Sequence, residues 1–352
     1  MTELNTFLKS LISAPGLSGF ETPVRDLIRA AWEPLTDEIG VSRLGSLHAK
    51  VNGSAPEPRP ALLLAAHMDA IGLMVSGVQQ GFLRLTEIGG LDPRVLPGQP
   101  VRVHGREELR GVIVQPPGHL LPSSAGKGPV PLEYLLVDVG LLPEQVKQLV
   151  RVGDLVSFDS QPIEMGPDVL AGHSLDNRAS VAAITHCLQE LQSRQHTWDV
   201  WAVATTQEEE TLGGAFTSAY ALQPALAVAI DVTFGSSPGS PSHKTFPMGK
   251  GITLGWGPNV HSGVFRAFKE LAERLEIPYQ IEVMPRHSGT DAYGLQVART
   301  GIPTMVVSIP LRYMHTPVEV ISMKDITRAG RLLAAFTASL EPDFMQNLTW
   351  DE

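Results

Sequence analysis

The chain has 352 residues, which is long for one compact domain and suits two. Hydrophobic residues make up 43% and charged residues 18%, a composition typical of a globular chain with a sizeable core. Lys and Arg number 27 against 37 Asp and Glu, so the net charge is −10. This acidic balance argues against a nucleic-acid partner.

The sequence also lacks targeting and membrane signals. Cys187 is the only cysteine, which excludes an intrachain disulfide, and it lies in an apolar helical stretch where we expect it to be core. The first residues lack a basic segment followed by an apolar one, so they do not resemble a signal peptide. No stretch approaches the roughly 20 apolar residues that cross a bilayer. We therefore expect a cytoplasmic protein without a membrane partner.

The first elements are two helices and a strand. Apolar residues recur at helical spacing between Leu4 and Ile12, before Pro15, and again from Thr22 to Trp32. After a Pro-rich loop, Ala61 to Ala66 form a short continuous apolar run, which favours a strand buried on both faces of a sheet.

The sequence pattern changes between Ile71 and Pro162. Short β-like pieces alternate there with Gly and Pro turns, and residues 143–150 are the one helix-like piece. Many short strands with turn signals predict a small β-barrel or sandwich. We expect residues 71–162 to be a β-domain inserted into a larger α/β domain formed by residues 1–70 and 163–352.

Helices and strands alternate again after Gly172. The expected helices cover residues 178–191, 264–275 and 325–340, and the expected strands cover residues 200–205, 225–232 and 302–309. This alternation predicts a mainly parallel sheet sandwiched by helices. Gly and Ser enrichment between Gly235 and Gly257 predicts loops with limited structure.

Metal-binding side chains follow several of these apolar runs. Two histidines and three carboxylates form a ligand set typical of a hydrolytic zinc or cobalt site, and a bridging carboxylate lets five side chains hold two ions. The five are His67, Asp176, Glu209, Asp231 and His315. Ligands bind outside the carboxyl ends of strands in open α/β sheets, so parallel strands would bring these distant residues together on one rim.

Each residue of this set, taken alone, also has an ordinary structural explanation. His67 alone suits a polar loop residue, Asp176 a first-turn helix acid and His315 a loop histidine. The spacing of His67 and Asp69 favours function, since residues i and i+2 of an extended segment point the same way and the carboxylate can hold the other imidazole nitrogen. A buried, unpaired Asp231 would be costly, so it needs a partner.

Three consecutive glutamates, residues 208–210, could be a solvated acidic run. They directly follow a buried strand and precede Gly213-Gly214, which suggests a tight turn into a helix. Glu209 can then be a ligand while Glu208 faces the attacking water as a base. His173 and His287 lie near the other motifs and are weaker candidates for substrate contact. The chain has no Gly-x-Ser-x-Gly elbow and no phosphate-binding loop motif.

At these residues the chain resembles the M42 family of dinuclear metallo-aminopeptidases, which includes the tetrahedral dodecameric TET peptidases. The motifs run in order along most of the chain: AHMDAIG, LDNR, QEEE followed by GGA, AIDVT, SGTDA and HTPVE. The resemblance implies a catalytic α/β domain with an inserted PDZ-like β-domain used for dimerisation. It also implies a homo-oligomer, either a dimer or a dodecamer, acting on peptides.

The resemblance also assigns roles. His67 and Asp231 would bind one metal, Glu209 and His315 the second, and Asp176 would bridge them. Glu208 would be the general base and Asp69 would support His67. The family usually binds zinc or cobalt. Two departures, Ala70 in place of a common glutamate and Glu210-Thr211 in place of Val-Gly, affect pocket details rather than the reaction class.

The favoured function is therefore a two-metal aminopeptidase that removes N-terminal residues with metal-activated water. A metal-dependent deacylase with similar chemistry is the nearest alternative. A glycoside hydrolase with paired carboxylates and a non-catalytic peptide-binding scaffold are the less favoured ones.

Overall fold

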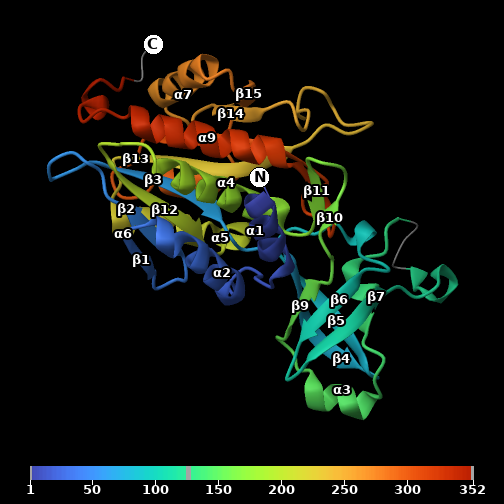
Figure 1. The fold of residues 1–352 in the computed structure, drawn as a ribbon. Coiled ribbons are helices and arrows are strands. Elements are labelled where there is room, and N and C mark those ends of the chain that lie inside the picture. The colour runs from blue at the N-terminus through green and yellow to red at the C-terminus, as the bar shows by residue number, and fades with distance from the viewer. Residues whose placement is uncertain (1, 124–127, 350–352) are drawn as a thin grey trace.

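Two sheets organise residues 2–123 and 128–349, the parts that the computed structural model describes. One is a large open sheet covered by helices. The other is a small closed β-barrel that projects from one end of the α/β part (Figure 1). The chain enters the barrel within a few residues of His67, because the sheet strand that ends at His67 is followed by a barrel strand beginning at Gly72.

The large sheet has eleven strands and a parallel centre. Along its main path they run β1 (Glu38–Val41), β2 (Leu47–Val51), β12 (Asp199–Thr205), β3 (Ala61–His67), β13 (Leu226–Phe234), β16 (Thr304–Arg312), β17 (Glu319–Ser322), β11 (Val169–Gly172) and β10 (Ile163–Glu164). Strand β14 (Ile252–Trp256) pairs with β16 and with β15 (Tyr279–Val283).

The direction of the strands differs from the sequence expectation. β12, β3, β13 and β16 are parallel to one another, but the strands outside this centre join it through antiparallel pairs. The sheet is therefore mixed rather than mainly parallel. The helix–strand alternation describes only the four central strands, whose apolar runs are buried on both faces.

Helices cover both faces of the centre. On one face α1 (Thr2–Ser13), α2 (Thr22–Trp32), α4 (Leu175–Leu191) and α9 (Met323–Ser339) pack together, and α7 (Ser262–Arg274) joins α9 and β14 (Figure 1). On the other face α6 (Gly213–Leu222) packs with α8 (Asp291–Gln296). The short α5 (Glu208–Thr211) lies just before α6. Single turns of 3-10 helix occur at Glu33–Leu35, Pro93–Val95, Gly118–Leu120, Leu132–Tyr134 and Phe344–Gln346.

One hydrophobic core joins this sheet to its helices, and a second fills the barrel. The helices reach the first core through apolar stripes such as Val24, Ile28 and Trp32 of α2. Cys187 is fully buried in the same core, as expected, and burial raises the pKa of its thiol. None of the described helices is both long enough and apolar enough to cross a bilayer.

The barrel closes in the order β4 (Gly72–Gln79), β5 (Phe82–Ile88), β8 (Leu136–Asp138), β7 (Glu108–Val114), β6 (Pro100–His104) and β9 (Leu155–Phe158). Helix α3 (Pro143–Leu149) lies at its far end (Figure 1). The expected small barrel is present, whereas the PDZ-like comparison is not confirmed. Closure removes free strand edges, and a free edge is what a PDZ domain uses to add a peptide strand.

The segment between Gly235 and Gly257 is a second difference. We expected loops with limited structure there, but its last part forms strand β14, which pairs with β15 (Tyr279–Val283). Gly255 explains the weak sequence signal, because a Cβ at this position would lie about 3 Å from Val306 and Met284. The small residue that permits close packing also lowers the β-propensity of the segment.

Candidate metal centre

The carboxyl ends of the central strands gather the predicted ligands. His67 is the last residue of β3, and Thr205 beside it ends β12. Glu208 and Glu209 follow in α5, and Asp231 lies near the end of β13. The parallel register expected from the sequence therefore places these residues on one rim of the sheet.

Asp176 lies between the two histidines. Its Oδ1 is 3.2 Å from His67 Nε2, and its Oδ2 is 3.5 Å from His315 Nε2. His67 Nε2 is also 3.9 Å from Asp231 Oδ1, and His315 Nε2 is 3.5 Å from Glu209 Oε2. One carboxylate thus presents one oxygen to each half of the cluster, which is the arrangement that a bridging ligand requires.

These spacings suit divalent cations. Zinc ligands at roughly 2.0–2.2 Å in tetrahedral geometry lie about 3.3–3.6 Å from one another. Two groups of three donors have their ligand atoms within 4.8 Å of one another: His67 with Glu208 and Asp231, and His67 with Asp176 and Glu209. Glu209 Oε1 is buried and has no hydrogen-bond partner among the described residues. The donor set therefore fits metal ions.

The electrostatics agree with this fit. Burial raises the pKa of Glu208 and of Asp231 well above the ordinary carboxylic value, and repulsion from neighbouring carboxylates adds to the effect. Burial, with repulsion from Asp176, raises the pKa of Glu209 to about 8. Hydrogen bonding to Asp176 raises the pKa of His315 to about 9. Acids packed so closely ionise together only when cations balance them.

Asp69 supports both sides of the cluster. Its Oδ1 lies 3.5 Å from His67 Nδ1, as the spacing in the sequence predicts. The same carboxylate accepts hydrogen bonds from the backbone N–H groups of Glu208, at 3.0 Å, and Glu209, at 3.2 Å. The backbone carbonyl oxygen of Asp69 lies closer to His67 Nδ1, at 3.2 Å. Asp69 therefore supports the histidine through its backbone and its side chain, and it holds the start of α5 through its fully buried carboxylate.

Two supporting residues were not singled out from the sequence. Glu319 is buried and accepts hydrogen bonds from the backbone N–H groups of Asp176 (3.0 Å) and His315 (3.2 Å). Arg178 is fully buried and donates to the backbone carbonyls of Met68, Leu11, Ala14 and Gly16. Both stand inside recognised motifs, HTPVE and LDNR, and an Arg two residues after a candidate ligand was the available signal.

A pocket of about 560 Å³ opens onto the cluster. Besides the candidate ligands and Glu208, its walls include apolar side chains, the exposed His287 and the acid Glu282. His287 lies 5.5 Å from Tyr293, ring centre to ring centre. The sequence candidate His287 is thus in reach of a ligand in this pocket.

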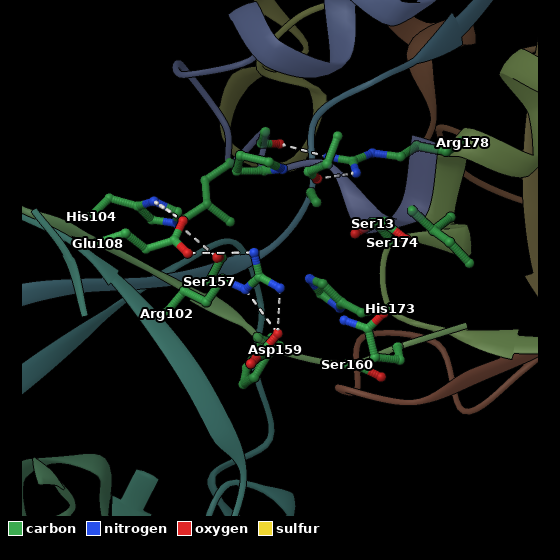
Figure 2. Close-up of a pocket in the computed structure, with 18 residues that line it drawn as sticks. Ser13, Arg102, His104, Glu108, Ser157, Asp159, Ser160, His173, Ser174 and Arg178 are labelled. Atoms are coloured by element: carbon green, nitrogen blue, oxygen red, sulfur yellow. Dashed lines mark hydrogen bonds and ion pairs between the residues drawn. The ribbon is translucent and has the colours of Figure 1, made fainter. Parts of the chain in front are cut away.

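His173 lines a different cavity, of about 30 Å³, between the barrel and the α/β part. Figure 2 shows its ring between Arg102 and Asp159 of the barrel side and Arg178 of α4. The ring packs edge-on against Phe158, with centres 4.9 Å apart, and burial lowers its pKa to about 4. A cavity of this volume has room for about one or two waters. Substrate contact by His173 stays a prediction from the sequence.

The two departures from the family pattern lie at the junction with the barrel. Ala70 lines the small cavity and exchanges backbone hydrogen bonds with Gly16 and Ser18. Glu210 Oε1 accepts from the backbone N–H of Gly89, at 2.6 Å, and so ties α5 to the barrel strand β5. A Cβ on the next residue, Gly90, would come within 3.3 Å of His315, so the barrel approaches the cluster here.

An α/β sheet that gathers histidines and carboxylates on one rim, beside an open pocket, defines a metallohydrolase class. The family model for M42 glutamyl aminopeptidase matches residues 45–332. The chain belongs to the M42 aminopeptidase family, whose members are metal-dependent peptidases.

Three relatives illustrate this membership. The chain is 34% identical to a lysyl aminopeptidase of Pyrococcus furiosus, over 95% of this chain and 97% of the relative. A TET aminopeptidase structure from a Thaumarchaeota archaeon has a TM-score of 0.93 at 30% identity and covers 99% of both chains. The TET1 peptidase of Pyrococcus horikoshii, which assembles into a tetrahedron or an octahedral shell, has a TM-score of 0.83 at 29% identity, covering 96% of this chain and all of its own.

The predicted reaction class is therefore confirmed. The chain is a peptide-bond hydrolase of the aminopeptidase type. The family model and the curated relatives favour this reaction over the deacylase and scaffold alternatives that the residues alone left open. A structure named as an endoglucanase, from Thermotoga maritima, is also similar, with a TM-score of 0.77 at 28% identity. The glycosidase alternative is therefore set aside on the family match, not on the structure comparison.

Proposed function

We propose that the chain is a two-metal aminopeptidase in which His67 and Asp231 hold one divalent cation and Glu209 and His315 hold the other. Asp176 contributes one carboxylate oxygen to each. The observation that carries this proposal is the position of Asp176 between the two imidazoles, at 3.2 and 3.5 Å. Bound divalent cations lower the pKa of water and polarise a carbonyl oxygen, and this donor set suits zinc and cobalt alike.

Glu208 is the proposed general base. Its carboxylate lines the pocket, with Oε2 3.7 Å from His67 Nε2, and its backbone is held by Asp69. It takes the proton of the attacking water and later delivers it to the leaving amine. The free α-amine of the peptide, a cation at neutral pH, lies against the acidic rim, which restricts cleavage to the N-terminal residue.

Glu208 is also close enough to His67 and Asp231 to be a ligand. The variant Glu208→Gln separates the two roles. As a base, Glu208 contributes about 10²–10⁴-fold to turnover, so the variant should lose that factor in kcat and still bind two metals per chain by elemental analysis. Near-normal turnover would remove Glu208 from its role as base. Loss of one metal would make it a ligand. Exposed Glu270→Gln on α7 is the matched control.

The roles of the two domains are a further part of this proposal. We propose residues 1–70 and 163–352 as the catalytic domain and residues 71–162, which contain the barrel, as the inserted domain that mediates dimerisation. The assembly of the similar Pyrococcus horikoshii peptidase into closed shells supports a homo-oligomer. Size-exclusion chromatography with light scattering on the whole chain tests this, with a monomer at micromolar concentration as the contradicting result.

A further inference from the structure

Glu282 is an acid of the large pocket that the proposed metal centre does not use. It lies on β15 and lines the pocket together with Asp176, Glu208, Glu209 and Asp231. Each of these other four carboxylates lies within ion-pair distance of His67 or His315. Glu282 takes part in none of the ion pairs found among the described residues.

The position of Glu282 follows from the register of the sheet. Asp231 pairs with Ser308, Ser308 with Thr253, and Gly255, two residues further on, pairs with Glu282. Paired residues, and residues two apart on a strand, point to the same face. Asp231 and Glu282 therefore project from the same face of the sheet, at two ends of one pocket floor.

The carboxylate of Glu282 reaches back across the floor toward β13. Its Oε1 accepts a hydrogen bond from Thr233 Oγ1 and its Oε2 accepts one from Thr253 Oγ1, both at 2.6 Å. Thr233 lies two residues beyond Asp231, which is about 7 Å along a strand. The carboxylate thus lies about one long side chain away from a proposed metal ligand.

The pocket between the two ends suits the stem of such a side chain. Val232, Phe234, Met284 and Met314 line it, and alkyl stems of Lys and Arg pack well on apolar surface. The pocket lining contains no Lys or Arg among the described residues. At the Glu282 end of the pocket an acidic substrate side chain would therefore meet a carboxylate and find no Lys or Arg to pair with.

We infer that Glu282 is the specificity-determining residue for the N-terminal side chain and selects lysine or arginine. This inference rests on the proposed function, because it places the substrate's α-amine at the acidic rim. Two hydroxyl donors orient the carboxylate but leave it without a counter-charge, and a substrate ammonium or guanidinium supplies one in a desolvated site. Burial also raises the pKa of Glu282, although Thr233 and Thr253 oppose this, which is what an acid lacking a cationic partner shows.

The test compares substrates that differ by one charge. The kcat/KM values for p-nitroanilides of lysine, arginine, norleucine and glutamate would be measured with the metal-loaded protein, Glu282→Gln and Glu282→Asp. Norleucine has the stem of lysine without its amine. We expect a lysine-to-norleucine ratio of about 100 in the unaltered protein, falling roughly 100-fold in Glu282→Gln, since charged pairs in desolvated pockets discriminate strongly. The ratio for Glu282→Asp, which keeps the charge, should lie between those of the unaltered protein and Glu282→Gln.

The outcomes separate the two proposals. A ratio that Glu282→Gln leaves unchanged, or a preference of the unaltered protein for norleucine, overturns the inference but not the aminopeptidase function. No hydrolysis of any of the four anilides by the metal-loaded protein would count against the proposed function itself. Norleucine hydrolysis by Glu282→Gln shows that this variant is folded, and exposed Glu270→Gln should keep the unaltered ratio.

Discussion

The carboxylates at the two ends of strand β12 differ in the partners that the chain gives them. At the amino end, Asp199 accepts hydrogen bonds from Gly53 N–H and from the Arg59 guanidinium, and Lys50 Nζ lies 3.1 Å away. At the carboxyl end, Glu209 Oε1 is buried and finds no partner among the described residues. The first carboxylate is balanced by the chain itself, whereas the second needs something that the chain does not supply.

This difference shows how a ligand site can be recognised. The criterion is whether a buried charged group has hydrogen-bond and ion-pair partners within the chain. A buried charge with a full set of partners is structural, since the fold has already compensated for its desolvation. Arg178, with four carbonyl acceptors, belongs to that kind although it lies two residues from Asp176. An acid with missing partners marks a place for a cation, and several such acids mark a place for more than one.

The largest effect of a substitution is expected in the cluster of candidate ligands beside the carboxyl end of β12. Asp176→Asn leaves the volume of the side chain but removes the charge that both halves of the cluster share. We expect kcat/KM for an aminoacyl anilide to fall on the order of 10³-fold, because several kcal/mol of transition-state stabilisation is lost with the metals. Exposed Asp26→Asn on α2 is the matched control. An Asp176→Asn protein that retains two metals and more than a tenth of its activity would remove the bridging role.

The variant Arg178→Met tests the structural role of Arg178. The substitution keeps the length of the apolar stem and removes the guanidinium donor from four backbone carbonyl groups. We expect the free energy of unfolding in urea to fall by about 3 kcal/mol. Arg331→Met, at an exposed position of α9, should change it by less than about 0.5 kcal/mol. Equal effects of the two variants would contradict a structural role for Arg178.

A smaller change is expected for Glu319→Gln. The glutamine can accept with only one oxygen, so one of the two backbone N–H groups, of Asp176 or His315, loses its partner. Supporting groups of this kind typically change metal affinity by about 10- to 100-fold. Titration of the metal against a competing chelator measures this, with Glu341→Gln as an exposed control. Unchanged affinity would show that Glu319 does not position the ligands.

The smallest effect is expected at the amino end, and it depends on pH. Burial tends to raise the pKa of Asp199, but hydrogen bonds from Gly53 and Arg59 and the charge of Lys50 lower it overall. A carboxylate with a lowered folded pKa stabilises the fold above its unfolded value of about 3.9, and this contribution is lost as pH falls through the folded value.

Asp199→Asn should therefore cost about 1 kcal/mol of unfolding free energy at pH 7, a figure reduced by solvent screening, and less below about pH 4. Urea unfolding of the variant and the unaltered protein between pH 7 and pH 3 measures the difference. A difference that stays constant over this whole range would show that the ionised form of Asp199 is not what stabilises the strand end.

The sequence indicated which residues gather at the candidate-ligand end of the pocket far better than which residues form its other end. His67, Glu209 and Asp231 follow long apolar runs, so a parallel register was enough to bring them together. The pocket around Glu282 depends on β14 and β15, which are short, lie outside the parallel centre and contain the packed Gly255. Local patterning does not reveal strands whose position is set by pairing with distant partners.

The supporting residues were hidden for a related reason. Glu319 and Arg178 each contact a backbone group that lies more than a hundred residues away in sequence, Asp176 N–H and Met68 C=O respectively. Spacing predicts which side chains share a face of a strand, as it did for His67 and Asp69. It does not predict which distant backbone group a buried charge will contact.

Anomalous diffraction from crystals of the metal-loaded protein tests the two-cation proposal most directly. Data collected on either side of the zinc or cobalt absorption edge should give two peaks per chain, one on each side of the Asp176 carboxylate, with His67 against one and His315 against the other. A single peak, or peaks at a site that Asp176 does not contact, would contradict the account.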